Sequence, residues 1–113
     1  MSRYTWILDA GHGGIIDGVY QTAGKRSPMF PDGSILYEGE FNRAIVKQVV
    51  KLCITHGIDS VNLVDTQEDM PLSERVRKAN TLHRRNKNSI YVSVHANAFG
   101  NGRDFNQANG VCT

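Results

Sequence analysis

The order of apolar patterns along the chain restricts the folds that it can adopt. Short runs rich in β-branched and aromatic residues, which predict strands, occupy residues 4–8, 60–64 and 89–94. Between them, residues 38–56 and 72–85 repeat apolar side chains at the spacing of a helix. Strands that alternate with helices form a parallel sheet with helices packed on its faces. The sequence therefore predicts an α/β fold of three layers, with a twisted, mostly parallel sheet flanked by helices.

The helical periods also predict which side chains face the sheet. The first helix has an apolar stripe made of Phe41, Ile45, Val49, Leu52 and Cys53. The second helix has an inward stripe made of Leu72, Val76, Ala79, Leu82 and His83. A basic run follows the second helix and its exit, and we interpret it as a solvated face: Arg75, Arg77, Lys78, Arg84, Arg85 and Lys87.

Length and composition exclude several classes of protein. The 113 residues have the size of one domain, so we expect residues 1–113 to form a single domain. The net charge of +2 is too small to indicate nucleic acid as a partner. No apolar stretch approaches the roughly 18 residues of a membrane span, so we expect no membrane insertion. Because the first strand begins within four residues of Met1, we expect synthesis in the cytoplasm without a signal peptide.

Two features predict that the sheet is incomplete in this chain. A parallel sheet needs both faces covered, and two helices are few for that purpose. The last residues, 110–113, have the composition of another strand at its beginning. We therefore expect the chain to be the N-terminal part of a larger domain. The alternative is a partner that covers the sheet.

The long turn-rich segment at residues 13–37 also predicts a functional role. A loop of this length inside a compact domain is uncommon unless it serves function. Met29 and Phe30 lie between two prolines. They would form either an apolar wall over a cleft or a cover for the edge of the sheet.

Three residues that can bind a metal stand at the ends of predicted elements. His12 follows the first strand within a glycine-rich turn, Glu38 opens the first helix, and His95 follows the last strand. Parallel strands would bring the two histidines to one edge of the sheet. Zinc accepts imidazole nitrogen and carboxylate oxygen, and catalytic sites keep three protein ligands. Each of the three also has a structural interpretation. His12 would be a polar loop residue and His95 would cap a strand. Glu38 would stabilise the helix N-terminus by its charge, for which Glu40 would serve equally.

Four motifs in this order resemble the zinc-dependent N-acetylmuramoyl-L-alanine amidases, the family of bacterial cell-wall autolysins and phage endolysins. The motifs are LDAGHGG at 8–14, EGEFN at 38–42, LSERVRKAN at 72–80 and YVSVHANA at 91–98. The resemblance implies hydrolysis of the amide bond between N-acetylmuramic acid and L-alanine in peptidoglycan, with Zn²⁺ as the cofactor.

The resemblance also implies the metal ligands. His12 matches the first zinc histidine of the family and His95 matches the second. The zinc glutamate of the family precedes an asparagine by four positions, so Asn42 makes the match Glu38 and not Glu40. The proline that the family usually carries before GHGG is Ala10 here.

One residue of the family pattern has no match. Members carry a further glutamate, the general acid/base, in a strand well beyond the second zinc histidine. Every glutamate of this chain precedes His95, so the resemblance implies no catalytic glutamate within the chain and places the expected one beyond Thr113.

Two more polar residues near the expected site have both a functional and a structural interpretation. Asp9 would either orient a metal ligand or act as a turn residue at the end of the first strand. Asn97 would either touch substrate or form the turn after the last strand.

Three functions therefore remain. The first is an amidase that acts on the cell wall after release from the cytoplasm, as phage endolysins do. The second is a fragment that binds zinc and peptidoglycan without activity, because the proton shuttle is missing. The third is a structural component of a phage assembly, whose partner completes the sheet.

Overall fold

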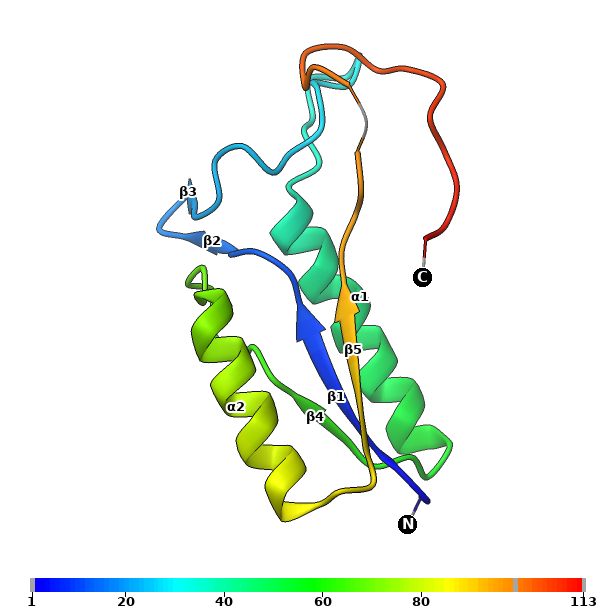
Figure 1. The fold of residues 1–113 in the computed structure, drawn as a ribbon. Helices are drawn as coiled ribbons and strands as arrows, with labels where there is room; N and C mark the ends of the chain where they lie inside the picture. The colour runs from blue at the N-terminus through cyan, green and yellow to red at the C-terminus, as the bar shows by residue number, and fades with distance from the viewer. Residues whose placement is uncertain (1, 99, 113) are drawn as a thin grey trace.

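The computed structural model describes residues 2–98 and 100–112, and a three-stranded parallel sheet lies at its centre (Figure 1). Strand β1 (Thr5–Ala10) is the middle strand, with β4 (Ser60–Asn62) on one side and β5 (Ser89–Val94) on the other. The three strands therefore begin at one end of the sheet and finish at the other. The predicted order of elements and the parallel pairing are confirmed.

The register of β1 with β5 determines what lies at the carboxyl edge of the sheet. All six residues of β1 pair with β5, from Thr5 with Ser89 to Ala10 with Val94. Both strands therefore end at the same level. The residues that follow them, His12 on one side and His95 on the other, leave the sheet at the same edge.

One helix covers each face of the sheet, which gives the three predicted layers. Helix α1 (Glu38–Thr55) packs through Val46 on Leu8 and Ala10. Helix α2 (Leu72–Arg85) packs through Ala79 and Leu82 on the opposite face, against a cluster of Ile7, Leu63 and Val64. Because side chains alternate along a strand, β1 contributes its even-numbered residues to one layer and its odd-numbered residues to the other.

The buried face of α1 differs from the predicted stripe. Val46 and Cys53 are buried together with the polar Asn42, whereas Phe41, Ile45 and Leu52 are exposed. The helix is rotated because its first turn packs tightly on the loop after β1. Gly39 and Asn42 both contact that loop, and these contacts decide which side of the helix faces the sheet.

Helix α2 departs from the prediction in a similar way. Ala79 and Leu82 face the core as predicted, but Leu72 is 74% exposed and Val76 is also exposed. Arg75, interpreted from the sequence as part of a solvated face, is only 5% exposed. Its guanidinium turns inward because a buried carboxylate, Asp9, lies beneath it on β1.

The segment at 13–37 contains a short hairpin that was not predicted. Strands β2 (Ile15–Ile16) and β3 (Val19–Tyr20) pair antiparallel, and both residues between them, Asp17 and Gly18, have positive φ. An Asp-Gly pair in this conformation is a common two-residue hairpin turn. Apart from this hairpin and an isolated bridge between Arg26 and Tyr37, the segment is irregular, as expected.

The described part of the C-terminal segment forms no strand. Residues 110–112 are irregular and exposed, so the expected strand does not begin there, and Thr113 lies outside the described residues. Within the described residues, neither helix has the length and apolar character needed to cross a membrane.

Candidate metal centre

The three candidate ligands come together at the carboxyl edge of the sheet. One ligand atom from each of His12, Glu38 and His95 lies within 4.8 Å of the others. Glu38 Oε1 is 3.3 Å from His12 Nε2 and 3.2 Å from His95 Nδ1. The two imidazole rings meet edge to face, with centroids 5.0 Å apart. Residues separated by up to 83 positions thus point their ligand atoms at one place.

The donor set and the two separations from Glu38 fit a zinc ion. Zinc takes imidazole nitrogen and carboxylate oxygen at about 2.0–2.2 Å in tetrahedral geometry. Bonds of that length at a tetrahedral angle separate two ligand atoms by about 3.3 Å. The two contacts of Glu38 Oε1 have this separation.

His12 is held in an unusual backbone conformation. Its φ of 62° lies in the left-handed region, which costs a non-glycine residue about 1–3 kcal/mol and persists only where the surroundings hold it. Two guanidinium groups donate to its carbonyl oxygen, Arg43 Nη1 at 2.9 Å and Arg75 Nη2 at 3.2 Å. Burial lowers the pKa of His12 below 6.5, against the opposing effect of Glu38. The imidazole is therefore neutral at pH 7, which is the form that binds a metal.

Glu38 and Glu40 have different surroundings although both lie in the first turn of α1. Glu38 Oε1 accepts a hydrogen bond from the Ala96 backbone N–H at 3.0 Å and a longer one from Asn42 Nδ2 at 3.4 Å. Glu40 Oε1 accepts the backbone N–H of Ile15 at 3.0 Å, in the loop that leads to β2. Only Glu38 faces the two histidines.

Glycines around His12 allow close approach of this chain's own groups. A Cβ on Gly11 would lie 2.2 Å from Cε1 of His95, in the space that the ring occupies. A Cβ on Gly39 would lie 1.6 Å from the carbonyl oxygen of Gly13. The groups that pack closely at this glycine-rich turn are the His95 ring and the start of α1.

Asp9 lies beneath the centre and contacts no ligand side chain. Its buried carboxylate accepts hydrogen bonds from Arg75 Nη1 at 2.5 Å, from Ser93 Oγ at 3.1 Å and from the Tyr91 hydroxyl. Burial, followed by the hydrogen bond to Asp9 and then by the Asp9 charge, raises the pKa of Tyr91, so its hydroxyl stays a donor. Arg75 therefore connects the Asp9 carboxylate to the His12 carbonyl. Asn97 is exposed, two residues after His95.

Sequence reasoning missed the two arginines that contact His12. A signal for Arg75 was present, because an aspartate that ends an apolar strand needs a cationic partner when it is buried. Arg43 had no comparable signal. Its partners are main-chain carbonyls, and no side-chain pattern marks a main-chain acceptor.

Loops rise above the centre at the same end of the molecule. The segment before α1 and the segment after β5 run close together there (Figure 1), and the rings of Phe30 and Phe105 are 4.9 Å apart. Phe30 thus contacts another loop, and Met29 beside it is exposed.

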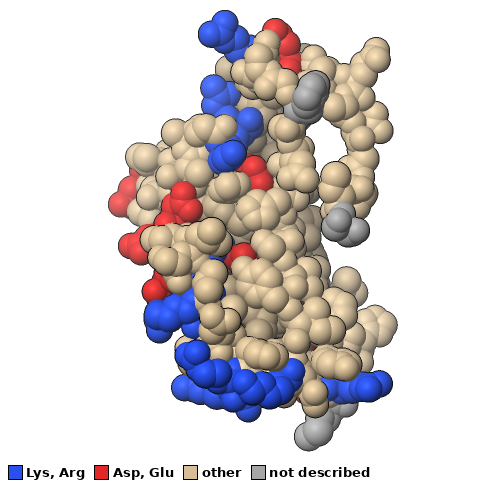
Figure 2. Space-filling view, viewed as in Figure 1, with Lys and Arg blue, Asp and Glu red and all other residues tan. Residues whose placement is uncertain are grey.

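At the opposite end of the molecule, Lys and Arg side chains gather where α2 ends with Arg84 and Arg85 (Figure 2).

Two comparisons with known proteins point to the same family. A family profile described as N-acetylmuramoyl-L-alanine amidase matches residues 7–113. The solved catalytic domain of CwlV, an N-acetylmuramoyl-L-alanine amidase from Bacillus (Paenibacillus) polymyxa var. colistinus, is similar with a TM-score of 0.58 and 26% identity. The match covers 87% of this chain and 48% of that one, so the chain spans about half the length of the solved domain. A search of curated protein sequences finds no match.

Proposed function

The chain belongs to the N-acetylmuramoyl-L-alanine amidase family, and from this premise we propose that it takes part in zinc-dependent hydrolysis of the amide bond between N-acetylmuramic acid and L-alanine in peptidoglycan. The observation that supports this proposal most is the convergence of His12, Glu38 and His95 at the edge of the sheet. The bacterial cell wall would be the place of action, as for endolysins and autolysins.

The proposed ligand atoms are His12 Nε2, Glu38 Oε1 and His95 Nδ1. A zinc ion bound there would polarise the amide carbonyl and lower the pKa of a water molecule toward about 7. His12 enters this arrangement as a neutral imidazole, since burial lowers its pKa. The Ala96 N–H holds the Glu38 carboxylate in place. The His95 side chain is 41% exposed, which leaves one side of the centre accessible to a polymer chain.

The reaction also needs a group that moves a proton to the departing nitrogen of L-alanine. The other carboxylates around the centre are engaged elsewhere. Glu40 accepts the Ile15 N–H, and Asp69 accepts the Thr22 hydroxyl and lies 3.8 Å from Arg75. We propose that none of them is the proton shuttle and that the glutamate implied by the family resemblance lies outside these 113 residues.

A second function follows from the same observation. If no carboxylate within the chain moves the proton, the chain by itself would bind zinc and peptidoglycan without cleaving the amide. The metal site would then be intact and the hydrolytic step would be absent.

One experiment separates these functions. Purified sacculi are incubated with the 113-residue chain, with and without a chelator, and new L-alanine amino groups and protein-bound zinc are measured in the same sample. Chelator-sensitive release supports the amidase. Bound zinc without release supports the binding function. Neither zinc nor release overturns the metal site and favours a structural role in a larger assembly.

Matched variants make the result specific. His12→Ala removes a proposed ligand and should abolish both zinc binding and any release. Lys47→Ala changes an exposed residue of α1 and should leave both unchanged.

A further inference from the structure

The backbone of His12 depends on contacts from both helices. His12 is the one proposed ligand with a left-handed φ, 62°, and φ determines where its Cβ, and therefore its ring, points relative to β1. In β1 the chain is held by strand pairing, but His12 lies two residues beyond the end of that strand. Other groups must therefore hold this conformation.

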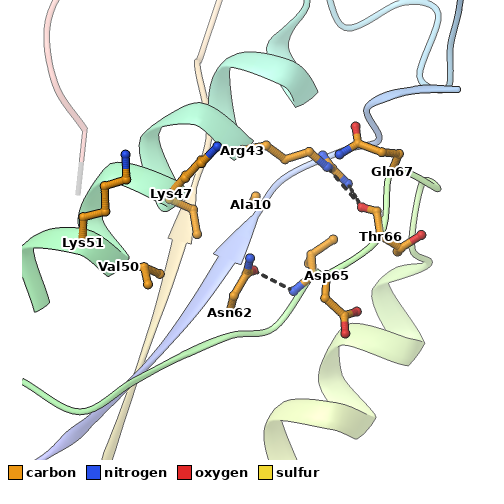
Figure 3. Close-up of a pocket in the computed structure, with 11 residues that line it drawn as sticks. Ala10, Arg43, Lys47, Val50, Lys51, Asn62, Asp65, Thr66 and Gln67 are labelled. Carbon is orange, nitrogen blue, oxygen red and sulfur yellow. Dashed lines mark hydrogen bonds between the residues drawn. The ribbon is translucent and has the colours of Figure 1, made fainter. Parts of the chain in front are cut away.

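Arg43 provides the contact from the α1 side. Its Nη1 donates to the carbonyl oxygens of His12 and Gly39, at 2.9 Å and 3.1 Å. Its Nε and Nη2 both donate to the carbonyl oxygen of Thr66, at 3.2 Å and 2.9 Å. Figure 3 shows this side chain extending from α1 to Thr66, at the margin of a hollow of about 360 Å³ between α1 and β4. One guanidinium thus ties the His12 loop to α1 and to the segment after β4.

Arg75 provides the contact from the α2 side. Its Nη2 donates to the His12 carbonyl at 3.2 Å, and its Nη1 donates to the Ala10 carbonyl at 2.7 Å. Its Nε donates to the carbonyl oxygen of Met70 at 2.8 Å, and Asp9 balances its charge. This guanidinium is buried, so its direction is fixed by these partners.

We propose that Arg43 and Arg75 are positioning residues for the metal centre. By donating to the same carbonyl from opposite layers, they hold His12 in the left-handed conformation that turns its Nε2 toward Glu38 and His95. Hydrogen bonds from a charged donor are stronger than neutral ones, and a carbonyl oxygen has lone pairs for both. The inference rests on the proposed function, because it treats His12 as a metal ligand.

The test removes the guanidinium of Arg43 and measures metal binding directly. Arg43→Met keeps an unbranched side chain of similar length without the donors. Arg43→Lys keeps the charge, but a single ammonium cannot reproduce the fork that joins His12 to Thr66. Lys47→Ala, one turn along α1, is the matched control. The measurements are the Kd for Zn²⁺, the visible spectrum with Co²⁺, and the HN–Hα coupling of His12 in the metal-free chain by NMR.

We expect Arg43→Met to weaken zinc binding by about 10–100-fold, as loss of an outer-shell partner typically does. Arg43→Lys should lose less, and Lys47→Ala should match the unchanged chain. The Co²⁺ spectrum and the His12 coupling should change in Arg43→Met while far-ultraviolet circular dichroism stays the same. A merely structural role would alter stability without changing these two signals.

The outcomes separate the inference from the proposed function. A folded Arg43→Met chain with unchanged zinc Kd, spectrum and coupling overturns the positioning role alone. If Arg43→Met does not fold, Arg43→Lys decides, and unchanged values in that variant overturn the role. If the unchanged chain binds neither Zn²⁺ nor Co²⁺, the proposed function fails and the inference fails with it.

Discussion

Two glutamates in one turn of α1 illustrate how position decides the role of a residue. Glu38 and Glu40 have the same chemistry and lie two positions apart, which on a helix directs them to different sides. Glu38 faces His12 and His95, whereas Glu40 holds the loop that leads to β2. Composition and helix propensity do not distinguish them, so the difference arises from the groups that each side chain contacts in the folded chain.

Replacing each glutamate separately tests this difference. Glu38→Ala should weaken zinc binding by more than the ~10–100-fold typical of outer-shell changes, because a proposed ligand is removed. Glu40→Ala should leave the zinc Kd close to its original value and lower the free energy of unfolding by about 1 kcal/mol, through loss of the Ile15 hydrogen bond. Titration calorimetry and urea denaturation measure the two effects. Loss of zinc binding in Glu40→Ala would contradict the ligand assignment.

Gly11 offers a second test at the scale of one residue. A methyl group there would occupy the space of the His95 ring, so Gly11→Ala should displace the ring and weaken zinc binding at least about 10-fold. Gly24→Ala is the matched control, because a Cβ at that position meets nothing within 4 Å. The zinc affinity of both variants tests this prediction. Equal affinity of Gly11→Ala and Gly24→Ala would show that the position of the His95 ring does not depend on the absence of a Cβ at residue 11.

At the scale of the elements, the start of α1 is determined by close packing and not by helix propensity. Tyr37, the residue before the helix, provides no side-chain cap. The first turn is instead held by the Glu38 N–H, which donates to the Lys25 carbonyl, and by the Gly39 N–H, which donates to the Tyr20 hydroxyl. The long segment before the helix thus takes the place of a capping residue.

Gly39→Ala measures how strongly this packing outweighs propensity. Alanine in place of glycine favours a helix by about 1 kcal/mol. Here, however, the added Cβ would lie 1.6 Å from the backbone oxygen of Gly13, and overpacking against a backbone costs about 1–3 kcal/mol. We expect a net loss of stability in urea denaturation, while Gln48→Ala, at an exposed position of α1, should change it by no more than about 0.5 kcal/mol. A gain in stability for Gly39→Ala would show that the loop around Gly13 moves to accommodate the added Cβ at little cost.

At the scale of the whole molecule, apolar surface remains exposed on both faces. Helix α1 exposes Phe41, Ile45 and Leu52. On the other face, Leu72 and Val76 line a groove of about 350 Å³ with Tyr91 of β5. Among the described residues, β5 pairs with a strand on one side only. Exposed apolar patches and unpaired strand edges favour association.

We therefore expect the 113-residue chain to self-associate as its concentration rises. The weight-average mass in sedimentation equilibrium should increase with concentration. Leu52→Lys combined with Leu72→Lys should reduce that increase without changing circular dichroism, since both side chains are more than half exposed. A single monomeric species at every concentration would contradict the expectation.

The sequence by itself determined the main strands and helices and the edge of the sheet where the proposed metal ligands lie. Strand and helix periods are local properties, so β5 and α2 were predicted with the bounds that the structure has. The alternation of strands and helices then predicted that His12 and His95 leave the sheet at one edge, and the resemblance to the amidase family implied Glu38 through its spacing to Asn42. The elements themselves depend on neighbours only a few residues apart.

Only the tertiary structure decided how the helices rotate and which polar groups they bury. Arg75 and Asp9 are 66 positions apart, and Arg43 and His12 are 31 apart. Whether such pairs meet depends on the packing of whole layers, because a buried charge is stable only where a partner is already in place. An apolar stripe therefore predicted that α1 faces the sheet, while contacts with the His12 loop decided which of its sides does so.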